Sequence, residues 1–557
     1  MAPLAASGAT VYPTGRPPTM APRGVVATPH YLASEAGAAV LRRGGTAIDA
    51  AVAAAAVLSV VYPHMCSIGG DNFWLIWDAR ERALKGLNGS GRAGARCTID
   101  FYRQHGAQEA IPSRGYLAAN TVPGAVDGWA AAYEHSRRSM GSPLAWSDLL
   151  QDATRYAERG YPVTPSQETW TVRNLDTVGG PARGLQRFEG FRRTYLADGA
   201  RPYRAGEVMR QRDLARTLTT IAAEGGRAFY EGDIARRIAA CLGAGGGVLT
   251  EGDFAGHRSD WVEPLTVTYR SAVAASLPPN TQGIAALSIL NVLDHLDVPS
   301  LGDGTADYVH AVVEATKLAF TDRDRWVTDP AFLRPPTDSL LARDYGAARA
   351  RLIDMGRAGR YVPGSSAGDT VFLAAVDEAR NAVALIQSIY HDFGSGIVAG
   401  DTGVLLQNRG TFFSLDPQHP NRLEPRKRTF HTLIPSMLLR GGRPFMVYGT
   451  MGGEGQPQTQ AALVTRVMDF GMNVQQAIEA PRWLYGRTWG ETTGALLLEG
   501  RFAPAVADDL ARRGHDVRRL ADWADTMGHA QAAIIDPEGG VLWAGADPRG
   551  DGAAIGF

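Results

Sequence analysis

Cysteine is scarce in this chain. Only Cys66, Cys97 and Cys241 occur among 557 residues, and they are far apart. Three scattered thiols exclude a disulfide framework and a clustered zinc site. The N-terminal stretch "MAPLAASGATVYPTGRPPTMAPRG" also lacks the basic start and the continuous apolar core of a secretory signal. We therefore expect a protein of a reducing compartment, the cytoplasm.

An excess of charge of one sign is missing too. The chain has 56 Lys and Arg against 57 Asp and Glu, a formal net charge of -1, so no long-range field attracts nucleic acid or an anionic membrane. The longest apolar run, residues 50–61, is too short to span a bilayer. Thr46 and Asp49 before this run predict a capped, buried helix instead. We expect neither nucleic acid nor a membrane as a partner.

Several familiar catalytic motifs are absent. The glycine-rich pieces "SIGGD" (67–71), "GAGGGV" (243–248) and "MGGEGQPQ" (451–458) lack the Lys-Ser/Thr of a P-loop and the context of a dinucleotide fingerprint. The twelve histidines form no HExxH motif, and no G-x-S-x-G elbow of an α/β-hydrolase occurs. We expect no organic cofactor and no metal.

What is present is a mixture of strand and helix patterns. Residues 73–78, 265–269 and 371–377 have the composition of strands, whereas 307–326 and 459–480 have apolar residues at three-to-four spacing. These patterns predict a mixed α/β or α+β architecture.

One segment divides the chain. Periodicity is lost in "IDMGRAGRYVPGSSAG", residues 353–368, where Gly, Ser and Pro accumulate. We expect a flexible N-terminal segment (1–23), a large part (24–369) and a small part (370–557).

The linker ends abruptly at Thr370, directly before an apolar strand. A threonine here can simply start that strand, because β-branched residues favour strands. The other interpretation is that the chain is cut between Asp369 and Thr370. An N-terminal threonine has an α-amine with an ordinary pKa of about 7.7 to 8.0, which can take the proton from its own hydroxyl. One residue then supplies both nucleophile and base.

Motifs from Gly24 to Phe557 resemble the γ-glutamyltransferases, a family of N-terminal nucleophile hydrolases matured by autocleavage before a threonine. In the front part they include "EAGAAVLRRGGTAIDAAVAAA", "NTVPGAVDGW" and "LPPNTQGIAALSILNVL", and in the back part "GDTVFLAAVD", "FGSGIVAGDTGVLLQN", "GTMGGEGQPQTQ" and "GADPRGDGAAIGF". The resemblance implies a four-layer αββα sandwich formed jointly by the two fragments. The fragments would stay associated as an αβ unit, and two such units could pair as a dimer.

The resemblance also assigns catalytic roles by position. Thr370 matches the nucleophile, and Asp369 and Thr370 flank the cleavage site. Ser388 stands where the family has a second threonine that orients the nucleophile. Gly452 and Gly453 match the pair whose backbone N–H groups form the oxyanion hole, a task for residues that let the backbone approach closely.

The substrate pocket departs from the family pattern. In γ-glutamyltransferases an arginine and a serine pair grip the α-carboxylate, and an aspartate binds the α-amine. The arginine position falls here on or near Ser90, with Arg92 close by. The other substituted positions are His431 and Thr432 for the serine pair, Phe412 for the aspartate, Tyr390 for an asparagine and Arg409 for a glutamine. We expect this set to bind a small anion, with its carboxylate on the planar fork of Arg409.

The lost aspartate argues against a γ-glutamyl substrate, because a buried ammonium without a partner is destabilised. The segments "IQSIYHDFGSGIV", "FHTLIP" and "GRTWG" look most like oxamate amidohydrolases of bacterial ureide breakdown. The resemblance therefore implies a small-molecule amide substrate, oxamate, hydrolysed to oxalate and ammonia. A γ-glutamyl hydrolase or transferase with an altered pocket, another amide acylase and a non-catalytic protein of the same fold are the alternatives.

Overall fold

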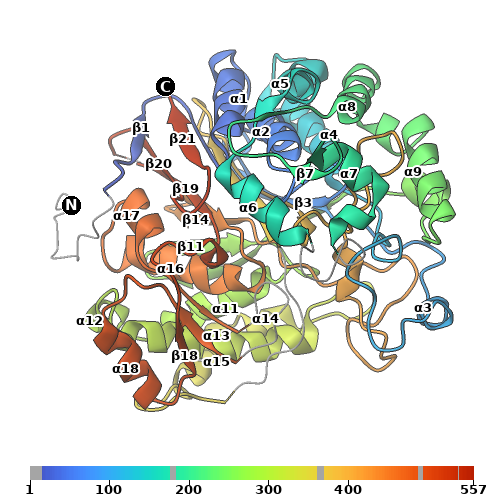
Figure 1. The fold of residues 1–557 in the computed structure, drawn as a ribbon. Coiled ribbons are helices and arrows are strands. Elements are labelled where there is room, and N and C mark those ends of the chain that lie inside the picture. The colour runs from blue at the N-terminus through green and yellow to red at the C-terminus, as the bar shows by residue number, and fades with distance from the viewer. Residues whose placement is uncertain (1–14, 176–183, 361–368, 487–493, 537) are drawn as a thin grey trace.

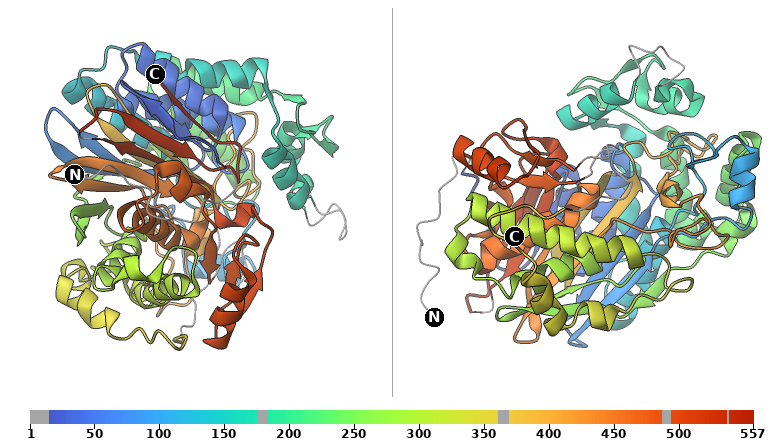
Figure 2. Two further views of the ribbon diagram at one scale, coloured as in Figure 1. Left: turned by 90° about the vertical axis from the view of Figure 1, so that its left-hand side faces the viewer. Right: turned by 90° about the horizontal axis from the view of Figure 1, so that it is seen from below.

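The computed structural model describes residues 15–175, 184–360, 369–486, 494–536 and 538–557. Two seven-stranded antiparallel sheets stack face to face between two layers of helices (Figures 1 and 2). This arrangement is the α+β, four-layer αββα sandwich that the sequence predicted.

The first sheet combines strands from the two predicted parts of the chain. Its order is β21 (Ala553–Gly556), β2 (Val25–Thr28), β12 (Asp369–Val376), β13 (Ala382–Tyr390), β3 (Asp71–Asp78), β4 (Ala83–Gly89) and β9 (Asp260–Val262). Strands β12 and β13 therefore lie in the middle, flanked by strands from the front part. Neither part could keep this sheet without the other.

The second sheet also draws on both parts. Its order is β1 (Thr19–Ala21), β20 (Leu542–Ala546), β19 (Ala530–Ile535), β15 (Arg443–Thr450), β14 (Ser436–Arg440), β11 (Ala272–Ser276) and β10 (Leu265–Tyr269). Of the N-terminal segment predicted to be flexible, residues 1–14 lie outside the described part. Thr19–Ala21, by contrast, form the edge strand β1, because their backbone pairs with Leu542–Ala544.

Strict alternation along β12 and β13 separates the layers. Val371 and Leu373 pack in the core under the first helix layer, whereas Phe372 and Ala374 pack in the core between the two sheets. Successive side chains of a strand point to opposite faces, so one strand serves both cores. The apolar residues of "VFLAAV" are buried for this reason.

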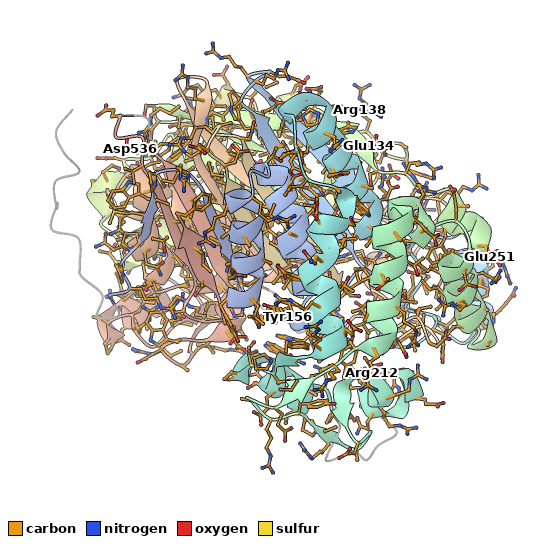
Figure 3. All side chains as sticks on the ribbon, turned by 90° about the horizontal axis from the view of Figure 1, so that it is seen from above. Glu134, Arg138, Tyr156, Arg212, Glu251 and Asp536 are labelled. Carbon is orange, nitrogen blue, oxygen red and sulfur yellow. The ribbon has the colours of Figure 1, made fainter. Side chains whose placement is uncertain are left out.

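The first helix layer covers the first sheet, as Figure 3 shows from above, with charged residues such as Glu134 and Arg138 on its outer side. Helix α2 is buried along its whole length, as expected of a helix that is apolar all round. The predicted capping box is confirmed, since the Thr46 and Asp49 side chains each accept a hydrogen bond from the other's backbone N–H. The main helices are α1 (Tyr31–Arg42), α2 (Ala47–Val61), α4 (Ala125–His135), α5 (Trp146–Arg159) and α8 (Arg212–Glu224).

The second helix layer packs on the other sheet and includes a correction. Residues 459–480 were predicted as one helical stretch, but the helix ends at Met468. Gly471 adopts a positive φ of 66°, which breaks the helix, and Asn473 caps the next one. The main helices are α11 (Gly283–Leu293), α13 (Ala306–Trp326), α15 (Arg343–Ala350), α16 (Gln456–Met468) and α17 (Val474–Glu479).

Smaller elements surround the sandwich. The predicted linker is described only as far as residue 360, and 361–368 lie outside the described part. The remaining helices are α3 (Ile99–Gln104), α6 (Pro165–Asn174), α7 (Glu189–Tyr195), α9 (Asp233–Ala244), α10 (Glu251–Ala255), α12 (Val298–Leu301), α14 (Thr337–Leu340) and α18 (Pro504–Arg512). The remaining strands are β5 (Tyr161–Pro162), β6 (Leu196–Ala197), β7 (Arg201–Pro202), β8 (Val208–Met209), β16 (Trp483–Tyr485), β17 (Leu496–Leu498) and β18 (Val517–Arg519).

Candidate active site

Thr370 lies at a β-bulge near the start of β12. Asp369 pairs with Tyr390 and Val371 pairs with Gln387, so Ser388 and Ile389 together face the single residue Thr370. The Thr370 side chain is fully buried, and within the described residues its Oγ1 has no hydrogen-bond partner. Bulges often occur beside active sites, where they redirect a side chain. A buried hydroxyl without a partner is unusual, and it is consistent with a group that reacts with a substrate.

Arg409 connects the residues around this bulge. It lies in a short 3-10 turn, η4 (Arg409–Phe412), and is buried. Its Nη2 donates to Ser388 Oγ at 2.9 Å, and its Nη1 donates to Thr432 Oγ1 at 3.1 Å. The same Ser388 oxygen accepts from the backbone N–H of Tyr390 at 2.8 Å. The guanidinium thus ties the predicted orienting hydroxyl to the predicted substrate pocket.

The charge of Arg409 has no carboxylate in contact within the described part of the chain. Burial lowers its pKa to about 10, while the proximity of Tyr390 and Asp71 acts in the opposite direction. It therefore stays cationic at neutral pH. Within the described residues its Nε has no hydrogen-bond partner. A buried cation of this kind is stabilised when an anion binds beside it.

Two aromatic rings cover the guanidinium. The Tyr390 ring centroid lies 4.5 Å from the Arg409 carbon and the Phe412 centroid 5.5 Å from it, and the two rings are 4.3 Å apart. Tyr390 has a positive φ of 80°, which is rare for a bulky residue and concentrates at functional sites. The predicted aromatic wall is present, and it stacks on the cation.

His431 contacts a residue that sequence analysis missed. Its Nε2 lies 3.3 Å from Oδ2 of Asp71, the first residue of β3. Asp71 is buried and stands directly opposite Ser388 in the register of β3 and β13. The "GGD" at the start of the strand "DNFWLIWD" could have signalled it, since a carboxylate that opens a mostly apolar strand is costly to bury.

The glycine pair follows β15 and precedes α16. Gly452 and Gly453 have φ values of 118° and 52°, a conformation that favours glycine. Gln282 Nε2 donates to the carbonyls of both Thr432 and Gly453, at 2.9 and 3.0 Å. It thereby links this turn to the group of side chains around Arg409 (Ser388, Tyr390, Phe412, Thr432 and, through His431, Asp71), called the Arg409 cluster below. The N-terminus of α16 carries partial positive charge, so the turn suits a developing oxyanion.

The front-part arginine candidate lies elsewhere. Arg92 pairs with Asp260 at 3.2 Å and Asp329 at 3.3 Å, so its charge is already matched by two carboxylates. Ser90 is buried and donates its hydroxyl to Asn88 at 2.6 Å. Neither residue contacts the Arg409 cluster through a hydrogen bond or an ion pair.

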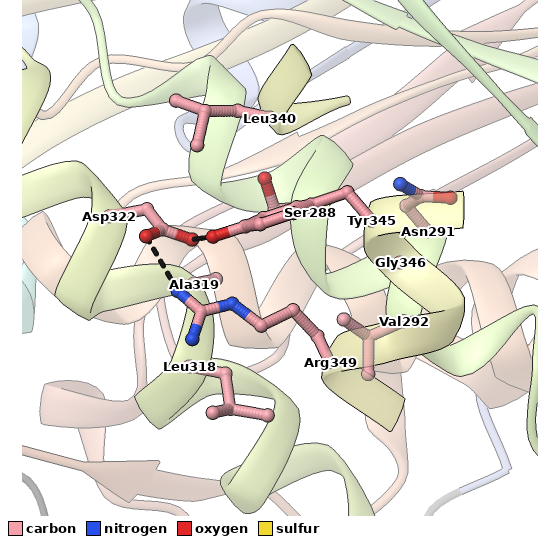
Figure 4. Close-up of a pocket in the computed structure, with 10 residues that line it drawn as sticks. All are labelled: Ser288, Asn291, Val292, Leu318, Ala319, Asp322, Leu340, Tyr345, Gly346 and Arg349. Atoms are coloured by element: carbon pink, nitrogen blue, oxygen red, sulfur yellow. Dashed lines mark hydrogen bonds and ion pairs between the residues drawn. The ribbon is translucent and has the colours of Figure 1, made fainter. Parts of the chain in front are cut away.

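Two other features of the described chain lie apart from this cluster. His310, Glu314 and His515 could hold a metal ion, but Lys317 Nζ already lies 2.6 Å from Glu314. A narrow pocket between α11, α13 and α15 is crossed by hydrogen bonds from Tyr345 and Arg349 to Asp322 (Figure 4). It contains none of the predicted site residues.

A family model described as Gamma-glutamyltranspeptidase matches residues 33–557. The chain belongs to this family. The predicted family and the predicted autoprocessed, amide-hydrolysing enzyme are thereby confirmed.

Relatives within the γ-glutamyltranspeptidase family match nearly the whole chain. The "Glutathione hydrolase-like YwrD proenzyme" of Bacillus subtilis is 46% identical, over 96% of this chain and 98% of that protein. The "Oxamate amidohydrolase proenzyme" of Klebsiella pneumoniae is 45% identical over the same shares. The crystal structure of cephalosporin acylase from Bacillus halodurans superposes with a TM-score of 0.89, at 38% identity and 99% coverage of both chains.

Replacement of Ser388 tests its link to Arg409. We expect Ser388→Ala to lower kcat by about 10- to 100-fold, because Arg409 and the Tyr390 N–H lose a shared acceptor inside the protein. Ser388→Thr keeps the hydroxyl, so it should lose less than about 3-fold. Steady-state amide hydrolysis by both variants measures this difference. Equal losses in both would show that the hydroxyl has no orienting role.

Proposed function

We propose that the protein is an amidohydrolase that cleaves a small acid amide, most closely oxamate, to the dicarboxylate and ammonia. The observation that carries this proposal is Arg409, a fully buried cation without a contacting carboxylate in the described residues, covered by two aromatic rings. A substrate carboxylate would supply the missing anion and could bind two guanidinium nitrogens at once. Both rings lie close to the guanidinium, an arrangement that would suit a short acid better than a long side chain.

The proposed chemistry is acyl transfer in two steps. After cleavage of the Asp369–Thr370 bond, the Thr370 hydroxyl attacks the amide carbonyl and its α-amine takes the proton. Backbone N–H groups of Gly452 and Gly453 hold the oxyanion, and the α-amine protonates the departing ammonia. Water then hydrolyses the threonyl ester, which releases the acid and restores the hydroxyl.

A γ-glutamyl substrate is the main alternative, since one relative is named glutathione hydrolase-like. Such a substrate brings an α-ammonium group. The buried carboxylate of the cluster, Asp71, already accepts hydrogen bonds from Gly91, Gly124, Gln407 and His431 on its two oxygens. It is poorly placed to accept a further cation, which supports the smaller substrate without an amine.

Further expectations accompany this function. We infer that the enzyme works in the cytoplasm, in ureide nitrogen use, as a cut αβ unit that could pair into a dimer. Within the described residues, no helix has the length and apolar character needed to cross a bilayer.

Ammonia release from oxamate tests the proposal, with γ-glutamyl-p-nitroanilide and a cephalosporin side-chain amide run beside it. We expect turnover of oxamate with kcat/KM at least about 100-fold above the other two, since only oxamate places a carboxylate on Arg409 at this distance from the amide. Preferred turnover of the γ-glutamyl compound would assign the enzyme to the glutathione-type members instead. Preferred turnover of the cephalosporin amide would assign it to the acylases.

A further inference from the structure

The carboxylate of Asp71 is held on both oxygens. Oδ1 accepts hydrogen bonds from the backbone N–H groups of Gly91 and Gly124 and from Nε2 of Gln407, each at 3.0 Å. Oδ2 lies 3.3 Å from Nε2 of His431. An ionised carboxylate accepts four such contacts, so Nε2 of His431 carries the hydrogen of this pair.

This assignment determines the other nitrogen of the ring. The pKa of His431 lies well below its usual range, because the ring is fully buried and close to the charge of Arg409. It is therefore neutral at ordinary pH, and a neutral imidazole protonated on Nε2 has a bare acceptor at Nδ1. Within the described part of the chain this Nδ1 has no hydrogen-bond partner. The ring is held edge-on against Phe73, with centroids 4.7 Å apart.

Among the buried atoms that lack a hydrogen-bond partner within the described residues are Thr370 Oγ1, Arg409 Nε and His431 Nδ1. Arg409 links their side chains, because its Nη2 donates to Ser388, which faces Thr370 at the bulge, and its charge lies close to His431. Thr432 joins them, because it follows His431 in the chain and accepts from Arg409. Thr370 Oγ1 suits the role of nucleophile, and Arg409 Nε can donate to a substrate carboxylate. The third needs a donor, and buried acceptors are seldom left without one.

We propose that Asp71 is a positioning residue that fixes His431 with Nδ1 as an acceptor, so that the pocket recognises the N–H₂ group of an acid amide. The inference rests on the proposed function. The hydrolysis product has a second carboxylate where the substrate has its amide, and its oxygens would face the lone pair of Nδ1. The Asp71–His431 pair therefore distinguishes the substrate from its own product and favours product release.

A pH dependence follows from the same geometry. Burial raises the pKa of Asp71 to about 6, against the opposing effect of its hydrogen bonds and of Arg409. The titratable groups around it are Arg409, His431, Tyr230 and, in a cut chain, the α-amine of Thr370. Burial and nearby carboxylates raise the pKa of Tyr230. A proton taken up by the pair puts an N–H on Nδ1 whether it settles on Oδ2 or on the ring. Oxalate should therefore inhibit more strongly as the pH falls through about 6.

Asp71→Asn tests the proposal with almost no change of shape. The amide oxygen can keep the three donors on Oδ1, while its NH₂ group donates to Nε2 and forces the hydrogen onto Nδ1. We expect kcat/KM for oxamate to fall by about 10²- to 10⁴-fold, as when a histidine is held in the wrong tautomer. Inhibition by oxalate should become at least about 10-fold stronger and lose its dependence on pH.

Asp78→Asn is the matched control. Asp78 ends the same strand and pairs with Nε2 of His135 at 3.0 Å, so the change is chemically identical but outside the site. It should leave oxamate turnover and oxalate inhibition as in the wild type. Unchanged oxalate inhibition in Asp71→Asn as well would overturn the proposal.

A spectroscopic measurement separates this inference from the choice of substrate. In protein labelled with ¹⁵N-histidine, the His431 signal is identified by its loss in His431→Gln. We expect the hydrogen on Nε2 in the wild type and on Nδ1 in Asp71→Asn. The same protonated nitrogen in both would refute the positioning role. A tautomer that changes in an enzyme unable to hydrolyse oxamate would instead reject the substrate and keep the role of Asp71.

Discussion

Thr370→Ala is expected to leave one uncut chain without amidohydrolase activity. The change removes the hydroxyl that we propose attacks first the preceding carbonyl and then the substrate. Cleavage and catalysis should disappear together, the activity by at least about 10³-fold. Denaturing gel electrophoresis and ammonia release on the same preparation measure both. N-terminal sequencing of the small wild-type fragment should begin at Thr370.

Thr370→Ser is the control for this change. Serine keeps the hydroxyl but loses the γ-methyl group that restricts χ1, so cleavage and turnover should continue more slowly. A Thr370→Ala chain that still separates at this bond would refute self-cleavage by Thr370. A cut but inactive Thr370→Ser chain would show that substrate hydrolysis requires a more restricted hydroxyl orientation than self-cleavage does.

The position of Thr370 explains why the surrounding sheet should be stable in both the cut and the uncut chain. The bulge already interrupts regular pairing between β12 and β13 at this residue. From Val371 onward, β12 pairs with β13 on one side and, at Ala374–Val376, with β2 on the other. Loss of the bond before Thr370 would therefore remove none of these ladder hydrogen bonds.

The fold was largely predictable because local sequence patterns predict many of its strands and helices. The continuous apolar run of residues 371–376 specifies a strand whose two faces are both buried, and the mostly apolar segment of α2 specifies a buried helix. The break between α16 and α17 was missed because the apolar spacing continues across Gly471, whereas a single backbone conformation ends the helix.

The candidate site residues, other than Asp71, were proposed from a family pattern, and their roles remain predictions. The structure gathers Arg409, Tyr390, Phe412, His431 and Thr432, which are up to 42 residues apart in the chain, around Ser388. Asp71 was missed because its partner His431 is 360 residues away and because "SIGGD" was considered only as a phosphate loop. Local spacing carries no information about such a contact.

Arg409→Met should strongly reduce the hydrolysis of an anionic amide while leaving the protein as stable or more stable. Methionine matches the aliphatic part of the arginine side chain, but it offers no charge for the substrate carboxylate. Truncating one partner of a buried, charged hydrogen-bonded pair costs about 2–5 kcal/mol, so kcat/KM for oxamate should fall by about 30- to 4000-fold. Because the wild-type cation is buried without a contacting carboxylate in the described residues, its removal relieves a desolvation cost. Thermal unfolding of the same samples measures that second effect.

Two further variants, Arg409→Lys and Arg92→Met, serve as controls for Arg409→Met. Arg409→Lys keeps the charge but loses the planar fork, so it should recover only part of the activity. Arg92→Met removes the guanidinium that is paired with Asp260 and Asp329 and should change oxamate turnover by less than about 2-fold. A large loss in Arg92→Met with little loss in Arg409→Met would place the substrate carboxylate on the front part of the chain, as in γ-glutamyltransferases. A raised apparent pKa of Asp71 in Arg409→Met would confirm that both groups share one electrostatic environment, since the charge of Arg409 now lowers it.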